Sequence, residues 1–543
     1  MFKFICLILF ITTLGICGAA NNTTDPTFYV SPTPINNYVS LNCGSSVQSP
    51  CNSILDAIYS FQNQTASNQT YFVVNLLPGV YFNNSTTYGV NDTVPLYGLN
   101  VTIQGYDPVN GVSAPVNITG KYRYPSTYLF NVAYTSQQLY VSTVIRFNNI
   151  IFDQVSYGIF TGSTSNMLDV QFNNCTVSNS RTYGSSPLIY IYSPRYLAYL
   201  TFNSVNVINN NYMSLLSANQ GYLNIYNSSF VGNRHYNFIK TSNVATTILG
   251  STFANNTASS SSYPTIGVTS TSVTIKNSSF INNAASNTIY ATVTVVTIDN
   301  CNFTKNVNTN YGVVYSYQGT NASISNSYFG QNYGRNGAGV YSYYTKTAIQ
   351  NCIFNSNQGN YGSAIYQSGS QIKLSNSTIL IQKVAPSVNY YSQYDAVYLQ
   401  STSATLTNNY IALGNGTVGY GFSLVYCSSS YITYNTSTII SNGQPSISCT
   451  SCSINHTNQD VEPSVLYCSN SDSSYNPPTP SPSRRINQAL RSALIALVVF
   501  FSFLLFISLI IICTCMFRQR RHHCSTEKST LVQCANNSIY TPI

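Results

Sequence analysis

Charged side chains are scarce in this 543-residue sequence, because only 6% of the residues are Asp, Glu, Lys or Arg. The formal net charge of +9 comes mainly from the two ends of the chain. Between residues 21 and 483, thirteen Lys and Arg stand against eleven Asp and Glu, with no basic stripe. This balance excludes binding to nucleic-acid phosphates. Asn, Ser, Thr, Tyr and attached sugars must therefore keep the surface soluble.

Acid–base catalysis and metal binding both need clustered side chains, and the sequence lacks such clusters. From residue 140 to 445 the acidic residues are four isolated aspartates, Asp153, Asp169, Asp299 and Asp395. The only histidine in that stretch is His235, which we interpret as a surface residue. We therefore predict no catalytic residue, no metal site and no cofactor, and expect that the chain is not an enzyme.

Two apolar segments flank the polar body of the chain. Lys3 precedes an apolar run from Phe4 to Ile16, which is typical of a secretory signal peptide over residues 1–20. A longer apolar run at 493–516 suffices to cross about 30 Å of hydrocarbon, and a basic cluster follows it. We therefore predict a single-pass type I protein of the cell membrane.

Between these segments one pattern repeats every 23 to 32 residues. It reads aliphatic, any, aliphatic, any, Asn, small, any, Phe, any, any, Asn. Its alternating runs, such as Val273–Ile275, have the period of 2 typical of β-strands, and its first Asn suits a turn with positive φ. The pattern predicts an all-β solenoid. The first Asn, which we call the corner asparagine, falls at Asn149, Asn174, Asn227, Asn277, Asn300, Asn326, Asn351, Asn376, Asn408 and Asn435, with Ser204 and Gly250 in its place in two further units.

The Phe-x-x-Asn half of the unit resembles the polymorphic outer-membrane-protein repeat. Gly337–Tyr341 and Gly362–Tyr366 are loose matches to the glycine-led strand of that family. Over residues 40–440 the chain is similar to pectin-lyase-like β-helix proteins. The resemblance implies a right-handed parallel β-helix of about 12 rungs with inward, stacked Phe side chains. A capping helix starting near Asn52 or Ser53 would close its first coil.

These features divide the chain into successive segments. The tail ends in Tyr540-Thr-Pro-Ile543, which resembles a Yxxφ sorting signal and implies endolysosomal cycling. The segments are a signal peptide (1–20), an N-terminal cap with the first coils (21–140), β-helix repeats (141–445), a Cys-containing C-terminal cap (446–475), a Pro-rich stalk (476–492), one transmembrane helix (493–516) and a cytoplasmic tail (517–543).

Cysteines gather at both ends of the repeats. Cys43 and Cys51 are close neighbours and are expected to pair. After the last rungs a second group can form two disulfides in any of three connectivities: Cys427, Cys449, Cys452 and Cys468. Within the repeats, Cys301 and Cys352 lie two rungs apart, about 9–10 Å, which is too far for a disulfide. We expect these two and Cys175 to be free thiols.

A second aligned row lies about ten residues before the corner asparagines, where a tyrosine follows an aliphatic residue. Strand alternation puts the two on opposite faces of the sheet. If the aliphatic residues face the core, the tyrosines form an exposed row about 4.8 Å apart, suited to binding sugar rings. If the tyrosines face inward, the row is only packing, and the sequence leaves both arrangements open. This tyrosine stripe consists of Tyr290, Tyr315, Tyr341, Tyr366 and Tyr398.

Nineteen Asn-x-Ser/Thr sequons lie between Asn21 and Asn455, which is typical of a secreted glycoprotein. Our candidate acceptors are Asn63, Asn68, Asn91, Asn100, Asn117, Asn321, Asn415 and Asn455. Further sequons coincide with corner asparagines: Asn174, Asn227, Asn277, Asn376 and Asn435. If the corner amides are buried, these should carry no sugar.

We predict from these features a cell-surface glycoprotein whose β-helix acts in adhesion or glycan binding. Its partners would be the membrane and a carbohydrate or other cell-surface ligand, not nucleic acid. One alternative is a pectin-lyase-like carbohydrate-active enzyme with an unfamiliar site. The other is a purely structural coat protein.

Overall fold

The computed structural model describes residues 25–32, 42–64, 71–82, 94–120, 128–133, 142–156, 158–163, 167–182, 186–193, 197–211, 214–381, 395–413, 423–440, 447–456 and 466–469. The predicted signal peptide, stalk, membrane segment and tail, with Tyr540 and Ile543, lie outside these residues, as do Asn68, Asn91 and Asn415. Within the described ranges, no helix is both long and apolar enough to cross a membrane.

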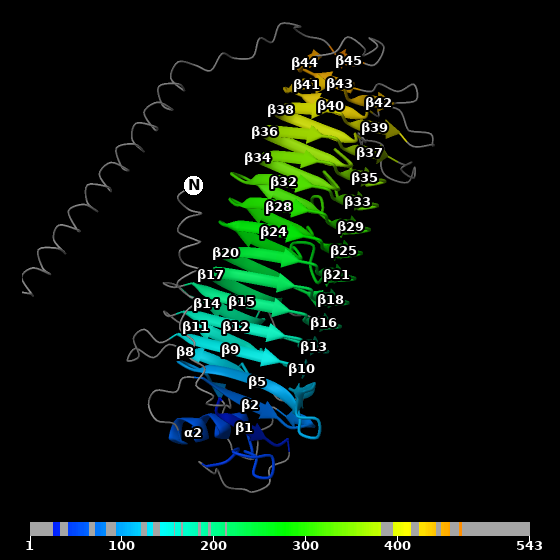
Figure 1. Cartoon of the computed structure of the whole chain (residues 1–543). Coiled ribbons are helices and arrows are strands. Elements are labelled where there is room, and N and C mark those ends of the chain that lie inside the picture. The colour runs from blue at the N-terminus through cyan, green and yellow to red at the C-terminus, as the bar shows by residue number, and fades with distance from the viewer. Residues whose placement is uncertain are drawn as a thin grey trace, which may run out of the picture. The chain divides into compact units, whose positions relative to one another are not determined.

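The described chain winds into a stack of coils whose strands pair in parallel, each with its equivalents in the coils before and after (Figure 1). Within a coil the chain runs along a first face, turns through a bend to a second face, and passes a corner to a third. The predicted all-β parallel β-helix is thus confirmed.

The first face contains β4 (Val94–Pro95), β8 (Phe130–Ala133), β11 (Phe160–Ser163), β14 (Pro187–Tyr192), β23 (Ile266–Thr269), β27 (Ile289–Thr292), β31 (Val314–Tyr317), β40 (Val425–Ser428), β43 (Ile447–Thr450) and β45 (Leu466–Ser469). The second contains β1 (Thr27–Val30), β2 (Tyr71–Leu76), β5 (Asn100–Asp107), β9 (Thr143–Asn148), β12 (Leu168–Asn173), β15 (Ala198–Asn203), β24 (Ser272–Lys276), β28 (Val295–Asp299), β32 (Asn321–Ser325), β41 (Tyr431–Asn435) and β44 (Ser453–His456). Long strands continue through the bend from the first face to the second: β17 (Ser214–Tyr226), β20 (Ile239–Leu249), β34 (Val340–Gln350), β36 (Ile365–Ser375) and β38 (Val397–Thr407).

The third face is a separate 14-stranded sheet of β3 (Val80–Phe82), β7 (Val116–Thr119), β10 (Ile150–Asp153), β13 (Thr176–Ser178), β16 (Asn206–Ile208), β18 (Ser229–Val231), β21 (Thr252–Ala254), β25 (Ser279–Ile281), β29 (Asn302–Thr304), β33 (Tyr328–Gly330), β35 (Ile353–Asn355), β37 (Thr378–Ile381), β39 (Tyr410–Leu413) and β42 (Thr438–Ile440). After it, some coils add a short strand: β19 (Arg234–His235), β22 (Thr257–Ala258), β26 (Ala284–Ala285) and β30 (Val307–Asn308). β6 (Val112–Ser113) pairs antiparallel with the end of β5.

Equivalent residues of successive coils pair in register, so that like side chains stack inside the coils. Val273 pairs with Val296, and Phe280 with Phe303. The Phe side chains of the Phe-x-x-Asn units are fully buried, and consecutive rings stack at 4.4 to 4.9 Å. The inward stacking predicted for these residues is therefore confirmed.

Corner residues have positive φ in successive coils, from 48° at Asn227 to 59° at Gly250. The corner side chains are nonetheless exposed or half-buried, so the condition under which their sequons were expected to stay unmodified is not met. The last predicted corner is wrong by one residue. Asn435 ends strand β41, and Thr436 adopts the turn with φ of 50°.

The buried amides belong instead to the second Asn of each unit. We call this set the buried asparagine ladder: Asn210, Asn233, Asn256, Asn283, Asn306, Asn332 and Asn357. In Asn306, for example, Nδ2 donates to Phe280 O at 2.9 Å and to Asn332 Oδ1 at 3.0 Å. Its Oδ1 accepts from Asn283 N at 3.1 Å. These bonds satisfy polar groups that could not otherwise be buried.

The first coils are closed by helix α2 (Ile54–Gln64). Ser53 Oγ accepts a hydrogen bond from Asp56 N at 3.1 Å, which satisfies one of the unpaired amides at the helix N-terminus. On the inner side the ring of Phe61 stacks on that of Phe72 at 4.0 Å. A disulfide joins Cys43 and Cys51 beside this helix.

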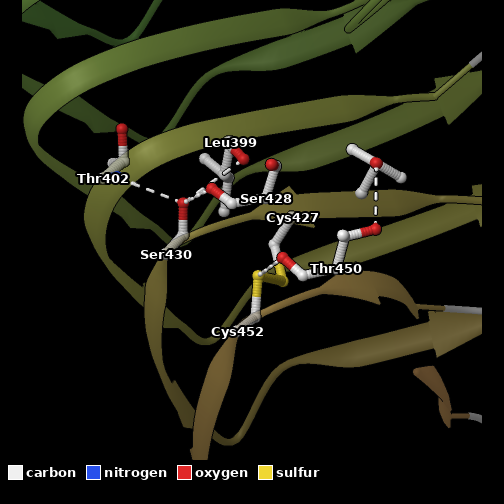
Figure 2. Close-up of a disulfide and its surroundings, with 8 residues drawn as sticks. Leu399, Thr402, Cys427, Ser428, Ser430, Thr450 and Cys452 are labelled. Atoms are coloured by element: carbon white, nitrogen blue, oxygen red, sulfur yellow. Dashed lines mark hydrogen bonds between the residues drawn. A yellow bond between two sulfur atoms is a disulfide. The ribbon is translucent and has the colours of Figure 1, made fainter. Parts of the chain in front are cut away.

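A second disulfide joins Cys427 on the first face to Cys452 near the end of the described coils (Figure 2). Beside it, Ser430 Oγ accepts from Thr402 N at 3.1 Å and donates to Ser428 O at 2.8 Å. Cys449 is also disulfide-bonded, and the side chain of Cys468 lies outside the described residues. The three cysteines that follow corner positions, Cys175, Cys301 and Cys352, are buried free thiols.

Candidate functional site

The tyrosine stripe lies on the outside of the first face. The aliphatic residue before each tyrosine, for example Val340 or Val397, is fully buried in the core. Strand alternation therefore turns the tyrosines outward. In-register pairing aligns them from coil to coil, with Tyr315 between Tyr290 and Tyr341. The row continues through Tyr366 to Tyr398.

Exposure varies along the stripe. Tyr315 and Tyr341 are only 9% and 7% exposed. Tyr311 covers both, because its ring centroid lies 4.5 Å from that of Tyr315 and 4.4 Å from that of Tyr341. Tyr366 and Tyr398 are half-buried. Tyr290, at the start of the stripe, is also half-buried, but the covered Tyr315 and Tyr341 separate it from the later rings. The continuous part of the stripe that a ligand can reach therefore lies in the later coils.

Sequence reasoning missed one member, Tyr426. It pairs in register with Tyr398, and it follows the buried Val425. The spacing signal was obscured by the wrong corner: Tyr426 stands ten residues before Thr436, the true corner. On the next coil the position belongs to Ser448, so the run of tyrosine rings ends at Tyr426.

The rings of the later stripe stack on one another rather than lying flat on the sheet. Centroids of Tyr341, Tyr366, Tyr398 and Tyr426 are 4.6 to 4.9 Å apart, and consecutive planes differ by 5° to 18°. Each inner ring is therefore covered on both faces by its neighbours. The surface of the stripe consists of ring edges and phenolic hydroxyl groups, which offer hydrogen bonds at a regular spacing.

The hydroxyl groups of Tyr341, Tyr366 and Tyr398 are uncharged at neutral pH, because burial raises their pKa. Burial raises the pKa of Tyr398 above the usual tyrosine value, and neighbouring tyrosines raise it further. The Tyr366 hydroxyl donates to Gln400 Oε1 at 2.8 Å. The Tyr426 hydroxyl lies 3.2 Å from Thr450 Oγ1. Neutral phenols and amides of this kind both donate and accept, as recognition of sugar hydroxyl groups requires.

A second polar cluster lies on the second face in the earlier coils. Gln171 Nε2 donates to Asp169 Oδ2 at 3.0 Å. Burial raises the pKa of Asp169, while this hydrogen bond and the charge of Arg146 lower it by smaller amounts. Asp169 pairs in register with Tyr199, whose ring stacks at 5.0 Å on that of Tyr222.

The other isolated acids and His235 do not join either cluster. Asp153 and Asp299 each accept hydrogen bonds from polar neighbours of the following coil. Asp395 is 1% exposed and accepts from Ser423 Oγ at 2.7 Å. His235 was predicted to lie on the surface, and this is wrong, because it is fully buried and packs on Phe238. His235 pairs in register with Ala258, so the repeat itself already indicated an apolar position there.

The described candidate acceptors for N-glycosylation are dispersed. Asn63 is exposed near the end of α2, and Asn321 and Asn455 are exposed on the second face. Asn100 and Asn117 are half-buried within β5 and β7.

Comparison with known proteins identifies relatives of the fold. Residues 214–379 match the family described as right handed beta helix region. No curated protein sequence matches the chain. Three similar solved structures are the tailspike protein 3 of bacteriophage CBA120, the A-module of mannuronan C-5 epimerase AlgE6 from Azotobacter vinelandii, and the surface protein and adhesin PfbA of Streptococcus pneumoniae.

These likenesses are remote and concern the fold alone. The tailspike is 12% identical in sequence, with a TM-score of 0.30, and the match covers 78% of this chain and 60% of the tailspike chain. The epimerase module is 12% identical in sequence, with a TM-score of 0.28, and the match covers 74% of this chain and 95% of the module. The adhesin is 11% identical in sequence, with a TM-score of 0.26, and the match covers 74% of this chain and 94% of the adhesin chain.

One expectation is corrected by the comparison. The structures with this fold include the epimerase and several polysaccharide lyases, so the prediction that the chain is not an enzyme is contradicted and is withdrawn. The family match and the parallel register together make the repeat region of this chain a right-handed parallel β-helix.

Proposed function

We propose that this chain is a surface glycoprotein whose β-helix binds an extended carbohydrate along the later tyrosine stripe. The observation that carries the proposal is the regular, outward row of Tyr366, Tyr398 and Tyr426 on consecutive coils. The coil spacing of about 4.8 Å is close to the advance of one hexose in an extended chain. Successive sugars can then meet equivalent hydroxyl groups.

The ring geometry refines how such a ligand is held. Because the tyrosine faces are occupied by neighbouring rings, the main contacts are hydrogen bonds from hydroxyl groups and from Gln400, rather than stacking of sugars on aromatic faces. Each hydrogen bond contributes about 0.5–1.5 kcal/mol net. Affinity must therefore come from several coils together, which favours polymers over single sugars.

The test is binding of the purified full-length chain to a broad glycan array. We expect Tyr398→Phe, which keeps the stacked ring but loses the hydroxyl group, to weaken binding by about tenfold. Tyr410→Phe, which removes the hydroxyl group of an exposed tyrosine on the third face, serves as the matched control and should leave binding unchanged. Equal loss in both variants, or no binding by the wild-type chain, would reject the stripe as the recognition surface.

The Asp169 cluster favours a second candidate function, chemistry on a polysaccharide. An acid with a raised pKa beside Arg146 and an aromatic pair is suited to proton transfer at a sugar. The test is incubation of the full chain with polymannuronate and with pectin, followed by analysis of chain length and sugar configuration. Activity lost in Asp169→Asn but kept in Asp299→Asn, on the same face, supports this function. Activity equal in both variants counts against it.

A further inference from the structure

Four corner asparagines are both sequons and exposed: Asn174, Asn227, Asn277 and Asn376. Each has a φ of 48° to 52°, which turns the chain sharply between the second and third faces. If the corner amides were buried, these sequons would carry no sugar. The structure instead buries the asparagines of the Phe-x-x-Asn units and leaves the corner side chains on the outer edge of the coils.

The hydrogen bonds of these corners are compatible with an attached sugar. Asn277 takes part in its corner bond through Oδ1, which accepts from Asn300 Nδ2 at 2.8 Å. Its own amide nitrogen is the atom that a glycan would modify. In Asn174, Nδ2 donates to Asn149 Oδ1, and a glycosylated amide keeps one N–H for that bond. Beside Asn227 the next corner is Gly250, which has no side chain.

The spacing of the four sequons also suits bulky modifications. Strand pairing separates Asn174 from Asn227, and Asn227 from Asn277, by two coils each. Asn277 and Asn376 are four coils apart. Adjacent sugars would thus stand about 10 Å apart or more. None of the four occupies a coil next to another.

The remaining described sequons follow a further rule, since they avoid the first face. Asn100, Asn321, Asn435 and Asn455 lie in strands of the second face, Asn117 and Asn302 in strands of the third face, Asn255 directly after β21, and Asn63 in helix α2. Within the described ranges, the strands of the first face contain no sequon. The tyrosine stripe lies on that face.

We propose that Asn174, Asn227, Asn277 and Asn376 carry N-glycans, forming a row of sugars along the corner between the second and third faces while the first face stays bare. The inference rests on the proposed function, because it requires passage through a secretory pathway. The inference goes beyond that function by stating which corner of the coils the glycans shield and which face stays open to the carbohydrate ligand.

Site-resolved mass spectrometry of the full chain from a eukaryotic secretory host tests the proposal. Enzymatic release of N-glycans in heavy-oxygen water marks each occupied asparagine. We expect occupancy above one half at the four corners and at the exposed references Asn63 and Asn321. Vacant corners with occupied references overturn the corner row but leave the surface glycoprotein intact. Vacancy at all sequons overturns both.

A designed glycan tests the bare face directly. Gln400→Asn completes a sequon with Thr402 beside Tyr398 on the first face. We expect its glycan to reduce carbohydrate binding at least tenfold, with recovery after enzymatic removal of the sugar. Gln400→Asp, which removes the same amide and creates no sequon, controls for the side chain. Asn277→Gln, which removes a corner glycan, should bind as the wild type does. Unimpaired binding by a verified Gln400→Asn glycoform would contradict the assignment of the first face.

Discussion

Asp395 places a carboxyl group inside the coils just before strand β38. Its Oδ1 accepts from Ser423, but its Oδ2 has no hydrogen-bond partner among the described residues. Burial therefore raises the pKa of Asp395 to about 7, against about 3.9 for an ordinary aspartate. Such a group is neutral in the folded chain at mildly acidic pH and must be charged, at a cost, at higher pH.

The expected consequence is stability that decreases as the pH rises from about 4 to about 7. Over this range the folded chain holds a proton that the unfolded chain has lost, so alkalinisation favours unfolding. Three pKa units correspond to up to about 4 kcal/mol. Melting temperatures of the wild type at pH 5 and pH 8 should differ, and Asp395→Asn should shrink that difference. An unchanged difference would show that Asp395 is solvated.

His235 acts in the opposite direction. Burial lowers the pKa of His235 to about 4, so the folded chain keeps the ring neutral while the unfolded chain binds a proton below about 6.5. Stability should therefore fall as the pH drops from about 6.5 towards 4. Denaturant titrations at pH 7 and pH 4.5 should show a smaller loss in His235→Phe than in the wild type. A histidine on the surface would give equal losses in both.

Among the elements, each coil contains two asparagines that recur with the same period but perform different tasks. In the coil of β29, Asn300 makes the exposed corner and Asn306 belongs to the buried asparagine ladder. The corner asparagine serves the backbone conformation, because Asn and Gly tolerate positive φ. The ladder asparagine serves hydrogen bonding between coils.

Their replacement should therefore differ in cost. Asn306→Ala leaves buried partners in the coils on both sides unpaired, and we expect a loss of about 3 kcal/mol or more. Asn300→Ala keeps the buried bonds but adopts an unfavourable φ, at about 1–2 kcal/mol, and Asn300→Gly should be close to neutral. Urea unfolding of the three variants measures the order. Equal costs for both alanine variants would contradict the separation of roles.

The strands of the repeat could be predicted from the sequence, because side-chain alternation and the Phe spacing are local patterns. Which asparagine is buried was not readable, since both repeat once per coil and both can stack amides. Only the backbone decides: the residue before each ladder asparagine, such as Lys305, also has positive φ, and that second turn points the following side chain inward. The exposure of the tyrosine rings was not predictable either, because Tyr311, a residue outside the repeating pattern, covers Tyr315 and Tyr341.

At the scale of the whole described unit, stability depends on how the end of the stack is closed. Helix α2 buries Ala57, Ile58 and Phe61 against the first coils, and the ring of Phe61 covers that of Phe72. The cap was predictable, because its N-cap and apolar face lie within one short segment.

Phe61→Ala should open this end. We expect a loss of about 3–5 kcal/mol for removing the ring, with the first coils most affected because each coil is supported chiefly by its neighbours. Limited proteolysis should then cut the early coils first and spare the tyrosine stripe. Tyr59→Ala, on the exposed side of the same helix, is the control. Uniform degradation of the unit in Phe61→Ala would argue against a local role for the cap.

The parallel register of the coils also determines how the described unit unfolds under mechanical force. Backbone hydrogen bonds between coils run along the axis of the stack, so a pull on its two ends loads the rungs in series rather than side by side. Each rung yields on its own and releases one coil, and the chain lengthens by about 3.3–3.6 Å for every residue freed. A protein anchored at one end and attached to a polymer on its flank would thus extend in repeated steps of one coil, each absorbing work, while coils beyond the attachment point stay folded.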